Sequence, residues 1–177
     1  MSSGGATGLS LQQHPTREEP SMPRQYVCLW FDREAEDAAT FYTSVFPNSS
    51  IGTVTRYPSD SGDRGGEVLT VAFELDGVPY VALNGGPQFT FDEAISITVD
   101  CKDQEEIDHY WDALTADGGE EGPCGWLKDR FGLSWQIVPQ DWDAIFSTDP
   151  DRAAKVFGAM MSMKKLDIAA LEAAGDS

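Results

Sequence analysis

The residues of this chain that could do chemistry are few and scattered. Cys124 stands in a glycine-rich loop beside Trp126, and Lys128 and Asp129 follow closely. A thiol in such a setting could become an activated thiolate, the nucleophile of covalent catalysis. Both histidines of the chain stand elsewhere in the sequence, so no base is at hand to deprotonate it. Cys124 is therefore a weak catalytic candidate, and a small structural residue at a strand start is the simpler interpretation.

The charge of the chain restricts its partners. Thirty acidic residues against twelve basic ones give a formal net charge of −18 over 177 residues. Such a field repels phosphate backbones and anionic lipid surfaces, so we expect neither nucleic acid nor membrane as a partner. No apolar run of about 18 residues and no signal-peptide pattern are present. Three cysteines without paired spacing fit a reducing compartment, so the sequence predicts a cytoplasmic protein with free thiols.

The elements that must position any site come from a duplicated pattern. Phe31-Asp32 is matched by Val99-Asp100, and Tyr42 is matched by Tyr110 at the same offset. Each copy begins with an alternating apolar strand and continues into a helix with an acidic start. Two copies are too few for a stacked array, so the pattern indicates two paired modules of one domain.

The remaining elements follow from periodicity and turn residues. Asp76-Gly77 between two alternating apolar runs predicts a tight hairpin, and Asp103 with Glu106 predicts a capping box at a helix start. Asp129 and Arg130 are expected to form a solvent-facing pair. The expected strands are residues 26–31, 51–57, 68–75, 78–83, 125–128 and 133–138, with one more from Ala94; the expected helices are 34–46, one ending at 117–119, and a last one from 149–150 through 173.

The chain divides into three parts on composition. Residues 1–23 lack apolar periodicity and are expected to form a disordered leader. Residues 24–140 are expected to form a single domain of two modules, 25–88 and 93–140. Residues 141–177 are expected to be a helical extension whose methionine-rich stripe covers a core or an interface.

Several short motifs resemble the vicinal oxygen chelate superfamily, which includes glyoxalase I, extradiol dioxygenases and bleomycin-resistance proteins. The match is similar to its PhnB-like branch, often labelled 3-demethylubiquinone-9 3-methyltransferase. The resemblance implies an α+β fold in which two paired βαβββ modules form a curved mixed sheet around a cleft. The helices lie on the outer faces of the sheet, and a C-terminal helix follows the second module. The resemblance also implies a homodimer. The motifs are Leu29-Trp30-Phe31-Asp32, Phe46-Pro47-Asn48-Ser49, Leu83-Asn84-Gly85-Gly86-Pro87, Cys124-Gly125-Trp126-Leu127-Lys128-Asp129 and Arg130-Phe131-Gly132-Leu133-Ser134-Trp135-Gln136.

Strand alternation predicts which side chains face the cleft, because every second residue of a strand points to the same side. Aromatic faces with sparse polar groups are typical of a site for a small, partly apolar molecule. The alternative is that these aromatics fill the cleft themselves. The predicted cleft wall is Tyr26, Cys28, Trp30, Thr70, Asn84, Thr98, Trp126 and Gln136.

Metal-dependent members of the superfamily hold an ion with four His or Glu side chains, and the resemblance places those positions here. Ala94 stands where one histidine would be, and Gln136 replaces the final-strand glutamate. The fourth position falls near residues 82–84, and His109 lies on the second helix, where a structural or solvent-facing role is expected. We therefore predict no functional metal and no cofactor.

Three functions are compatible with the sequence. The leading hypothesis is a metal-free binder of a small molecule, with its exact activity open. The second is a metal-dependent lyase or dioxygenase of the glyoxalase type, and the third is a dimeric interaction module in which the C-terminal helix makes the contact. Methyl transfer is not expected, because no glycine-rich strand-to-helix turn of a doubly wound sheet is present.

Overall fold

The computed structural model describes residues 25–146 and 148–177, and the predicted leader lies outside them. The first module contains β1 (Val27–Phe31), α1 (Ala35–Val45), β2 (Ser50–Arg56), β3 (Val68–Leu75) and β4 (Val78–Asn84). Its sheet has the order β1-β4-β3-β2, with β1 parallel to β4 and the other pairs antiparallel. The predicted βαβββ unit is confirmed.

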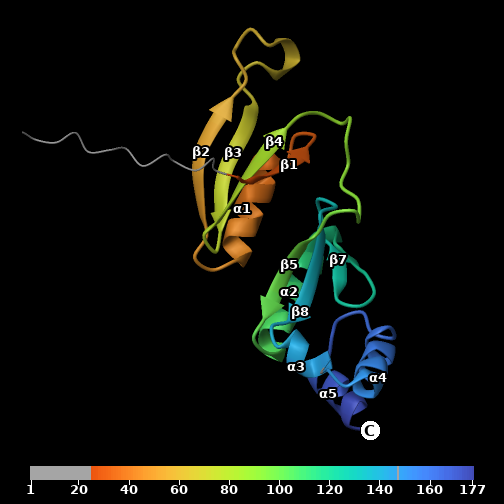
Figure 1. Ribbon diagram of the computed structural model, residues 1–177. Coiled ribbons are helices and arrows are strands. Elements are labelled where there is room, and N and C mark those ends of the chain that lie inside the picture. Colours follow the sequence, from red (N-terminus) through yellow and green to blue (C-terminus); the bar gives the residue numbers. More distant parts are fainter. Residues whose placement is uncertain (1–24, 147) are drawn as a thin grey trace, which may run out of the picture.

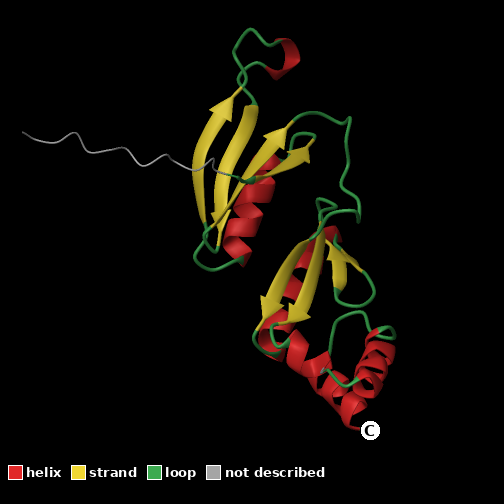
Figure 2. Ribbon diagram, viewed as in Figure 1, coloured by secondary structure: helices red, strands yellow, loops and turns green. Residues whose placement is uncertain are grey.

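The second module repeats this topology with shorter strands. It contains β5 (Ile97–Cys101), α2 (Gln104–Thr115), β6 (Glu120–Glu121), β7 (Trp126–Lys128) and β8 (Ser134–Pro139), in the order β5-β8-β7-β6. Two separate four-stranded mixed sheets result, each carrying one helix, and Figures 1 and 2 show them one above the other. The α+β fold of two βαβββ modules is as predicted.

Local chemistry explains the hairpin and the start of α2. Asp76 and Gly77 both have positive φ, 45° and 79°, as a tight turn between β3 and β4 requires. Asp103 caps α2 by accepting a hydrogen bond from the Glu106 amide at 3.0 Å. The Glu106 carboxylate binds the Lys102 amide, so the second bond of the box lands one residue earlier than the usual pattern.

One core joins the two modules through the helix-bearing faces of both sheets. Tyr42 of α1 and Phe46, which follows the end of α1, reach the second module, where their ring centroids lie 5.4 and 5.3 Å from that of Trp135. Phe46 also stacks on Tyr110 of α2 at 5.0 Å. These rings belong to a single buried cluster that spans both modules, so each helix contributes to a shared interior.

Asp129 lies in this core, which corrects the expected solvent-facing pair with Arg130. Only 2% of Asp129 is exposed. One of its oxygens accepts bonds from Tyr42 Oη at 2.7 Å and Trp135 Nε1 at 2.8 Å, and the other accepts the amides of Phe131 and Leu133. Four donors replace the water that burial removes, so the carboxyl fastens α1 to the β7–β8 turn.

Arg130 itself faces outward. Its guanidinium lies over the ring of Phe41 at 4.2 Å and pairs with Asp117. A surface contact of this kind stabilises little compared with the buried one beside it.

The C-terminal extension folds into three helices, whereas one helix was expected after residue 149. They are α3 (Trp142–Phe146), α4 (Pro150–Met160) and α5 (Ile168–Asp176). The chain breaks between α4 and α5 because Asp167 caps α5 through the Ala170 amide, and Gln104 of α2 binds the main chain on both sides of that cap. The extension packs its helices around a second small core, to which β8 contributes Val138; the other members are Ile145, Val156, Leu166 and Leu171.

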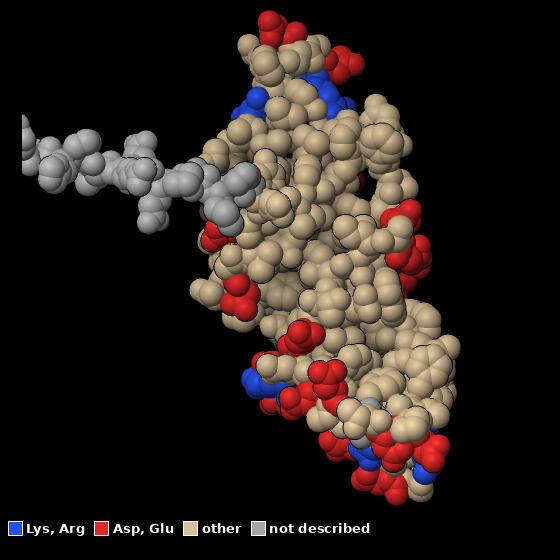
Figure 3. All heavy atoms as spheres, in the orientation of Figure 1, with Lys and Arg blue, Asp and Glu red and all other residues tan. Residues whose placement is uncertain are grey.

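No helix within the described ranges is long and apolar enough to cross a bilayer. In the view of Figure 3 the acidic side chains gather over the lower part of the molecule, where Figure 1 places the second module and the extension. The middle of this face is largely uncharged.

Candidate functional site: two open sheet faces

In the first module, the sheet face opposite α1 is covered by no helix among the described residues. Leu83 is the pairing partner of both Trp30 and Thr70, and Thr70 is in turn paired with Thr55. The Thr55 and Thr70 hydroxyls lie 2.6 Å apart. Two residues along each strand, a second row on the same face consists of Cys28, Val81 and Ala72. We call this surface the first open face; it is mainly apolar, with a hydroxyl pair at one side and Glu74 in the same row of β3 as Thr70 and Ala72.

In the second module, the equivalent row is Thr98, Gln136 and Trp126, which are direct partners across β5, β8 and β7. This second open face is partly overlaid by the chain that enters β5. The Gln136 amide donates to the Ser96 hydroxyl at 2.8 Å, and Ser134 reaches the Asp92 carbonyl. The two rows therefore occupy matching positions of the repeat but have different polarity.

Trp30 is fixed by the segment that links the modules. Its indole N–H donates to the Gly86 carbonyl at 2.8 Å, and its ring contacts Phe89 edge-on at 5.0 Å. A side chain at Gly85 would begin 2.2 Å from the indole, closer than any real contact. The Gly85-Gly86-Pro87 segment is thus shaped to hold a tryptophan.

Both open faces are hollowed. The first carries a cavity of about 510 Å³ at its lower end, lined by Tyr26, Ala72, Glu74 and Val81 among others. The second carries a cavity of about 430 Å³, with Trp126 and Lys128 in its wall beside Gly122, Pro123 and Ser134. These volumes suit small organic molecules.

Charge on the second open face is largely paired. Lys128 lies 2.7 Å from Glu93, and this hydrogen bond lowers the pKa of Glu93 and raises that of Lys128. On the first open face, Cys28 is exposed but partly desolvated by its neighbours, and this desolvation raises the pKa of its thiol, so it stays protonated at neutral pH. Neither face presents an isolated strong charge from these groups.

The structure divides the predicted cleft wall into two sets. Tyr26, Cys28, Trp30 and Thr70 belong to the first open face, and Thr98, Trp126 and Gln136 to the second. Tyr26 lines the hollow on the first face, Trp126 lines the hollow on the second face, and Trp30 lines a third hollow; none of the three contains predicted residues from both sets. Within one chain, the two halves of the expected wall are therefore not brought together.

Asn84 lies on the opposite side of the first sheet from the one predicted. It is 5% exposed, accepts the Ala35 amide at 2.8 Å at the start of α1, and donates to the Val68 carbonyl. Its neighbour Leu83 takes the predicted place beside Trp30. Asn84 therefore supports the helix and is not part of the wall.

Alternation along the closing strand also predicts that Ser134 faces the cleft. Sequence reasoning missed three wall residues, namely Val81, Leu83 and Lys128. Strict alternation along β4, counted outward from Ala82, would have found the first two. The ion pair of Lys128 could not be found this way, because Glu93 comes from a segment outside the strands.

Cys124 has no activating neighbour within hydrogen-bond reach among the described residues. Its sulfur contacts the Met161 thioether at 3.6 Å. Lys128 is engaged with Glu93, and Asp129 is buried with Tyr42. The sequence proximity that suggested an activated thiolate therefore does not become spatial proximity.

The described residues contain no group of three or more His, Cys, Asp or Glu side chains arranged to hold a metal ion. His109 is exposed on α2, with its ring nitrogen 3.5 Å from the Val45 carbonyl. At the second-module positions, Ala94 offers no donor and Gln136 offers a neutral amide that already binds Ser96. The donor set is poor for a divalent cation.

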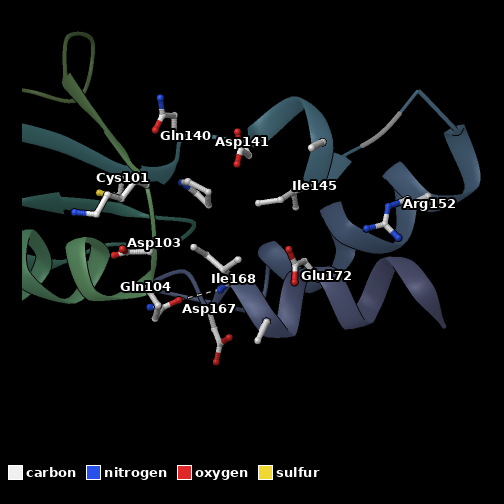
Figure 4. Close-up of a pocket in the computed structure, with 14 residues that line it drawn as sticks. Cys101, Asp103, Gln104, Gln140, Asp141, Ile145, Arg152, Asp167, Ile168 and Glu172 are labelled. Atoms are coloured by element: carbon white, nitrogen blue, oxygen red, sulfur yellow. Dashed lines mark hydrogen bonds between the residues drawn. The ribbon is translucent and has the colours of Figure 1, made fainter.

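A further hollow of about 470 Å³ lies between the second module and the extension, away from both open faces. Figure 4 shows its apolar floor, which includes Ile145 and Ile168, and the carboxylates of Asp141 and Glu172 at its rim. The Gln104 side chain crosses to the extension at its edge. This hollow is a seam where the added helices meet the domain.

Comparison with known proteins places this architecture. A family model described as 3-demethylubiquinone-9 3-methyltransferase matches residues 23–138. A PhnB protein from Bacillus cereus carrying the same description is 32% identical, with a TM-score of 0.58; the match covers 66% of this chain and 99% of that one. The structure of PA1353 from Pseudomonas aeruginosa is 16% identical with a TM-score of 0.55, covering 67% and 98%.

No curated protein sequence matches the chain significantly. The family model ends at residue 138, so the three-helix extension lies beyond the shared domain. The family match and the two βαβββ modules agree. The chain therefore belongs to the 3-demethylubiquinone-9 3-methyltransferase family, the PhnB-like branch of the vicinal oxygen chelate fold.

Proposed function

We propose that this protein binds a small, partly apolar molecule between two open sheet faces, and that the two faces come from two copies of the chain. The observation that carries the proposal is that Trp30 and Trp126 stand in equivalent rows of the two sheets, yet line different hollows within one chain. Trp126 lines the hollow on the second open face, and Trp30 lines another hollow together with Phe89. A homodimer that apposes the first face of one copy with the second face of the other would complete a wall on both sides. Hydroxyl and amide groups would orient the ligand inside it.

The edges of the sheets support such an assembly. β1 and β5 each have a strand neighbour on one side only. Unpaired edges of this kind are satisfied when another strand is placed alongside. In a two-fold dimer, β1 of each copy could lie beside β5 of the other, so the same contact would form twice.

The composition of the walls favours a neutral ligand over an anionic one. Lys128 is the cation on the second face, and Glu93 already neutralises it. The first face offers an indole, aliphatic side chains and the hydroxyl pair of Thr55 and Thr70. A metal-dependent lyase or dioxygenase activity finds little support here, because Gln136 and Ala94 are unsuited to hold the ion.

Methyl transfer from an adenosylmethionine donor also finds little support, whatever the family's description. Each described sheet is a four-stranded mixed one, with a helix on one face only. The doubly wound parallel sheet with a glycine-rich phosphate turn belongs to a different architecture. Calorimetric titration with adenosylmethionine would contradict this view if it gave saturable, stoichiometric heat.

The decisive experiment is native mass spectrometry of the untagged protein, combined with metal analysis and titration of N-phenyl-1-naphthylamine, a neutral apolar fluorophore. We expect a metal-free dimer that binds the probe. Trp30→Ala and Trp126→Ala should each weaken probe binding by about tenfold or more, since a large aromatic wall is lost. Trp142→Ala, in the extension, is the matched control and should leave probe affinity unchanged.

Mixing the two variants tests whether the site is shared. Co-refolded Trp30→Ala and Trp126→Ala chains form hybrid dimers in which one site has both tryptophans. If the mixture binds the probe with wild-type affinity at fewer than one site per chain, the shared cleft is supported. If the mixture binds the probe as weakly as each variant alone, the shared cleft is contradicted. A stoichiometric divalent metal in the purified protein would favour the lyase or dioxygenase alternative instead.

A further inference from the structure

The loop that carries Trp126 has an unusual backbone. Cys124 and Gly125 have φ angles of 58° and 83°, so two consecutive residues lie in the left-handed region. Within residues 122–126, which we call the Trp126 loop, the Gly122 amide bonds the Trp126 carbonyl and the Trp126 amide bonds the Pro123 carbonyl. A non-glycine residue holds such a conformation only where surrounding contacts determine it.

Those contacts come from the C-terminal extension. The amides of Cys124 and Gly125 donate to the carbonyls of Met163 and Lys164, each at 2.8 Å. Leu166 is fully buried, and a Cβ atom at Gly125 would lie 3.1 Å from its side chain. We call residues 163–168 the clamp segment, because they satisfy the two amides that the left-handed turn points outward.

The clamp segment is itself held from its other side by α2. Gln104 donates to the Leu166 carbonyl and accepts from the Ile168 amide, both at 3.0 Å, as the close-up in Figure 4 shows for Ile168. Lys165 pairs with Asp108 and Asp112. The segment thus lies between a helix of the domain and the Trp126 loop, with fixed partners on both sides.

The Trp126 loop forms part of the hollow on the second open face, through Gly122, Pro123 and Trp126. The family model stops at residue 138, before the clamp segment begins. We infer that the clamp segment is a positioning element for the ligand site: by fixing the Trp126 loop, an element outside the family's common domain sets the shape of the second wall. Leu166 and Gln104 are its positioning residues, and the inference rests on the proposed function for its link to a ligand.

Hydrogen exchange of the full-length protein tests the positioning directly. Leu166→Ala should accelerate amide exchange in a peptide covering residues 120–128 by about tenfold or more, because the loop opens locally. Leu171→Ala is the matched control: Leu171 is equally buried in the same small core but lies in α5, beyond the clamp segment. It should leave exchange in 120–128 close to that of the wild type.

Gln104→Met provides a second, milder variant that keeps both cores intact. It should raise exchange in 120–128 in the same direction by a smaller factor, since only the far side of the clamp segment is released. The inference would be overturned if Leu166→Ala and Leu171→Ala accelerated amide exchange in 120–128 equally, or if neither variant accelerated it.

Binding of N-phenyl-1-naphthylamine then links position to function. Leu166→Ala should raise its dissociation constant about fivefold relative to Leu171→Ala, because Trp126 no longer stands in its wall position. If exchange responds selectively but the wild type binds no probe, the proposed function fails and the positioning stands. If the wild type binds and both variants bind equally well, the clamp segment does not shape the site.

Discussion

In the first module the open face is built on strands of five, seven, eight and seven residues and remains uncovered, whereas in the second the strands have five, two, three and six. The second face is also overlaid by the chain entering β5 and bounded by the extension. Duplication therefore kept the topology and the register of the rows while the surroundings diverged. One copy kept a broad apolar wall, and the other became a smaller, more polar wall with added supports.

The two modules are nevertheless joined by one buried group, and its removal is the most direct way to break their association. Asp129→Ala should lower the free energy of unfolding by about 4 kcal/mol, because four donors from both modules lose their buried acceptor. Urea denaturation followed by tryptophan fluorescence would measure this. Asp117→Asn, which removes the charge of the exposed partner of Arg130 and tolerates the positive φ of 55° at this position, is the control and should cost little. A loss below about 1 kcal/mol for Asp129→Ala would mean that the junction does not depend on this carboxyl.

A change inside the first module should have a smaller effect. Asn84→Ala should cost about 2 kcal/mol, since the Ala35 amide at the start of α1 and the Val68 carbonyl both lose a buried partner. Gln136→Ala, on the second open face, is the matched amide control and should change stability by less than about 0.5 kcal/mol. If Asn84→Ala and Gln136→Ala lowered the free energy of unfolding equally, the buried position of Asn84 and the open-face position of Gln136 would be contradicted. Thermal or urea unfolding would measure this.

The pH dependence of the junction sharpens the comparison further. Burial raises the pKa of Asp129 above its ordinary value, although hydrogen bonds from Trp135, Tyr42 and two amides act in the opposite direction. Since the folded pKa is the higher one, the carboxyl's contribution is fully present below its unfolded pKa of about 3.9 and is lost as pH rises through the folded value.

The difference in unfolding free energy between the wild type and Asp129→Asn isolates this contribution from the other carboxylates. It should favour the wild type most at the acidic end and shrink toward neutral pH. A difference that instead grows with pH would show that Asp129 is stabilised as the ion.

The smallest predicted effect compares cysteines of the two equivalent strands. Cys28 of β1 is exposed, whereas Cys101 of β5 is fully buried and its pKa is raised to about 12, first by burial and then by nearby acidic groups. Under iodoacetamide at pH 8, Cys101 should be alkylated about a hundredfold more slowly than Cys28. Peptide mass spectrometry over time checks this, with denatured protein as the control for intrinsic reactivity. Similar rates for the two thiols would show that β5 opens readily.

Local patterns predicted most of the framework because they are local in origin. The α1 helix, the Asp76-Gly77 hairpin and the Asp103 cap depend on residues close together in sequence, and they form as predicted. The errors arose where distant partners decide. Asp129 is buried because Tyr42 and Trp135 supply donors, and no spacing rule places those residues around it.

The last helical region shows the same limit. Its apolar spacing runs through residues 161–167, yet the helix ends at Met160 and this stretch forms turns and irregular backbone, which Gln104 and the Trp126 loop bind. For the candidate site, alternation assigned most wall residues to the correct sheet face. It failed at Asn84, one residue out of phase, where the helix start required a buried amide. Whether two faces meet is a question of assembly that strand periodicity cannot answer.

The contact between Gly85 and Trp30 has a consequence for how such a site can change over time. With the indole in place, any side chain at position 85 would overlap it. The reverse order carries no such obstacle, because a smaller residue at position 30 leaves Gly85 undisturbed. Variation in this wall is therefore directional: a lineage must give up the tryptophan before the glycine is free to diverge, and it cannot regain the ring until the glycine returns.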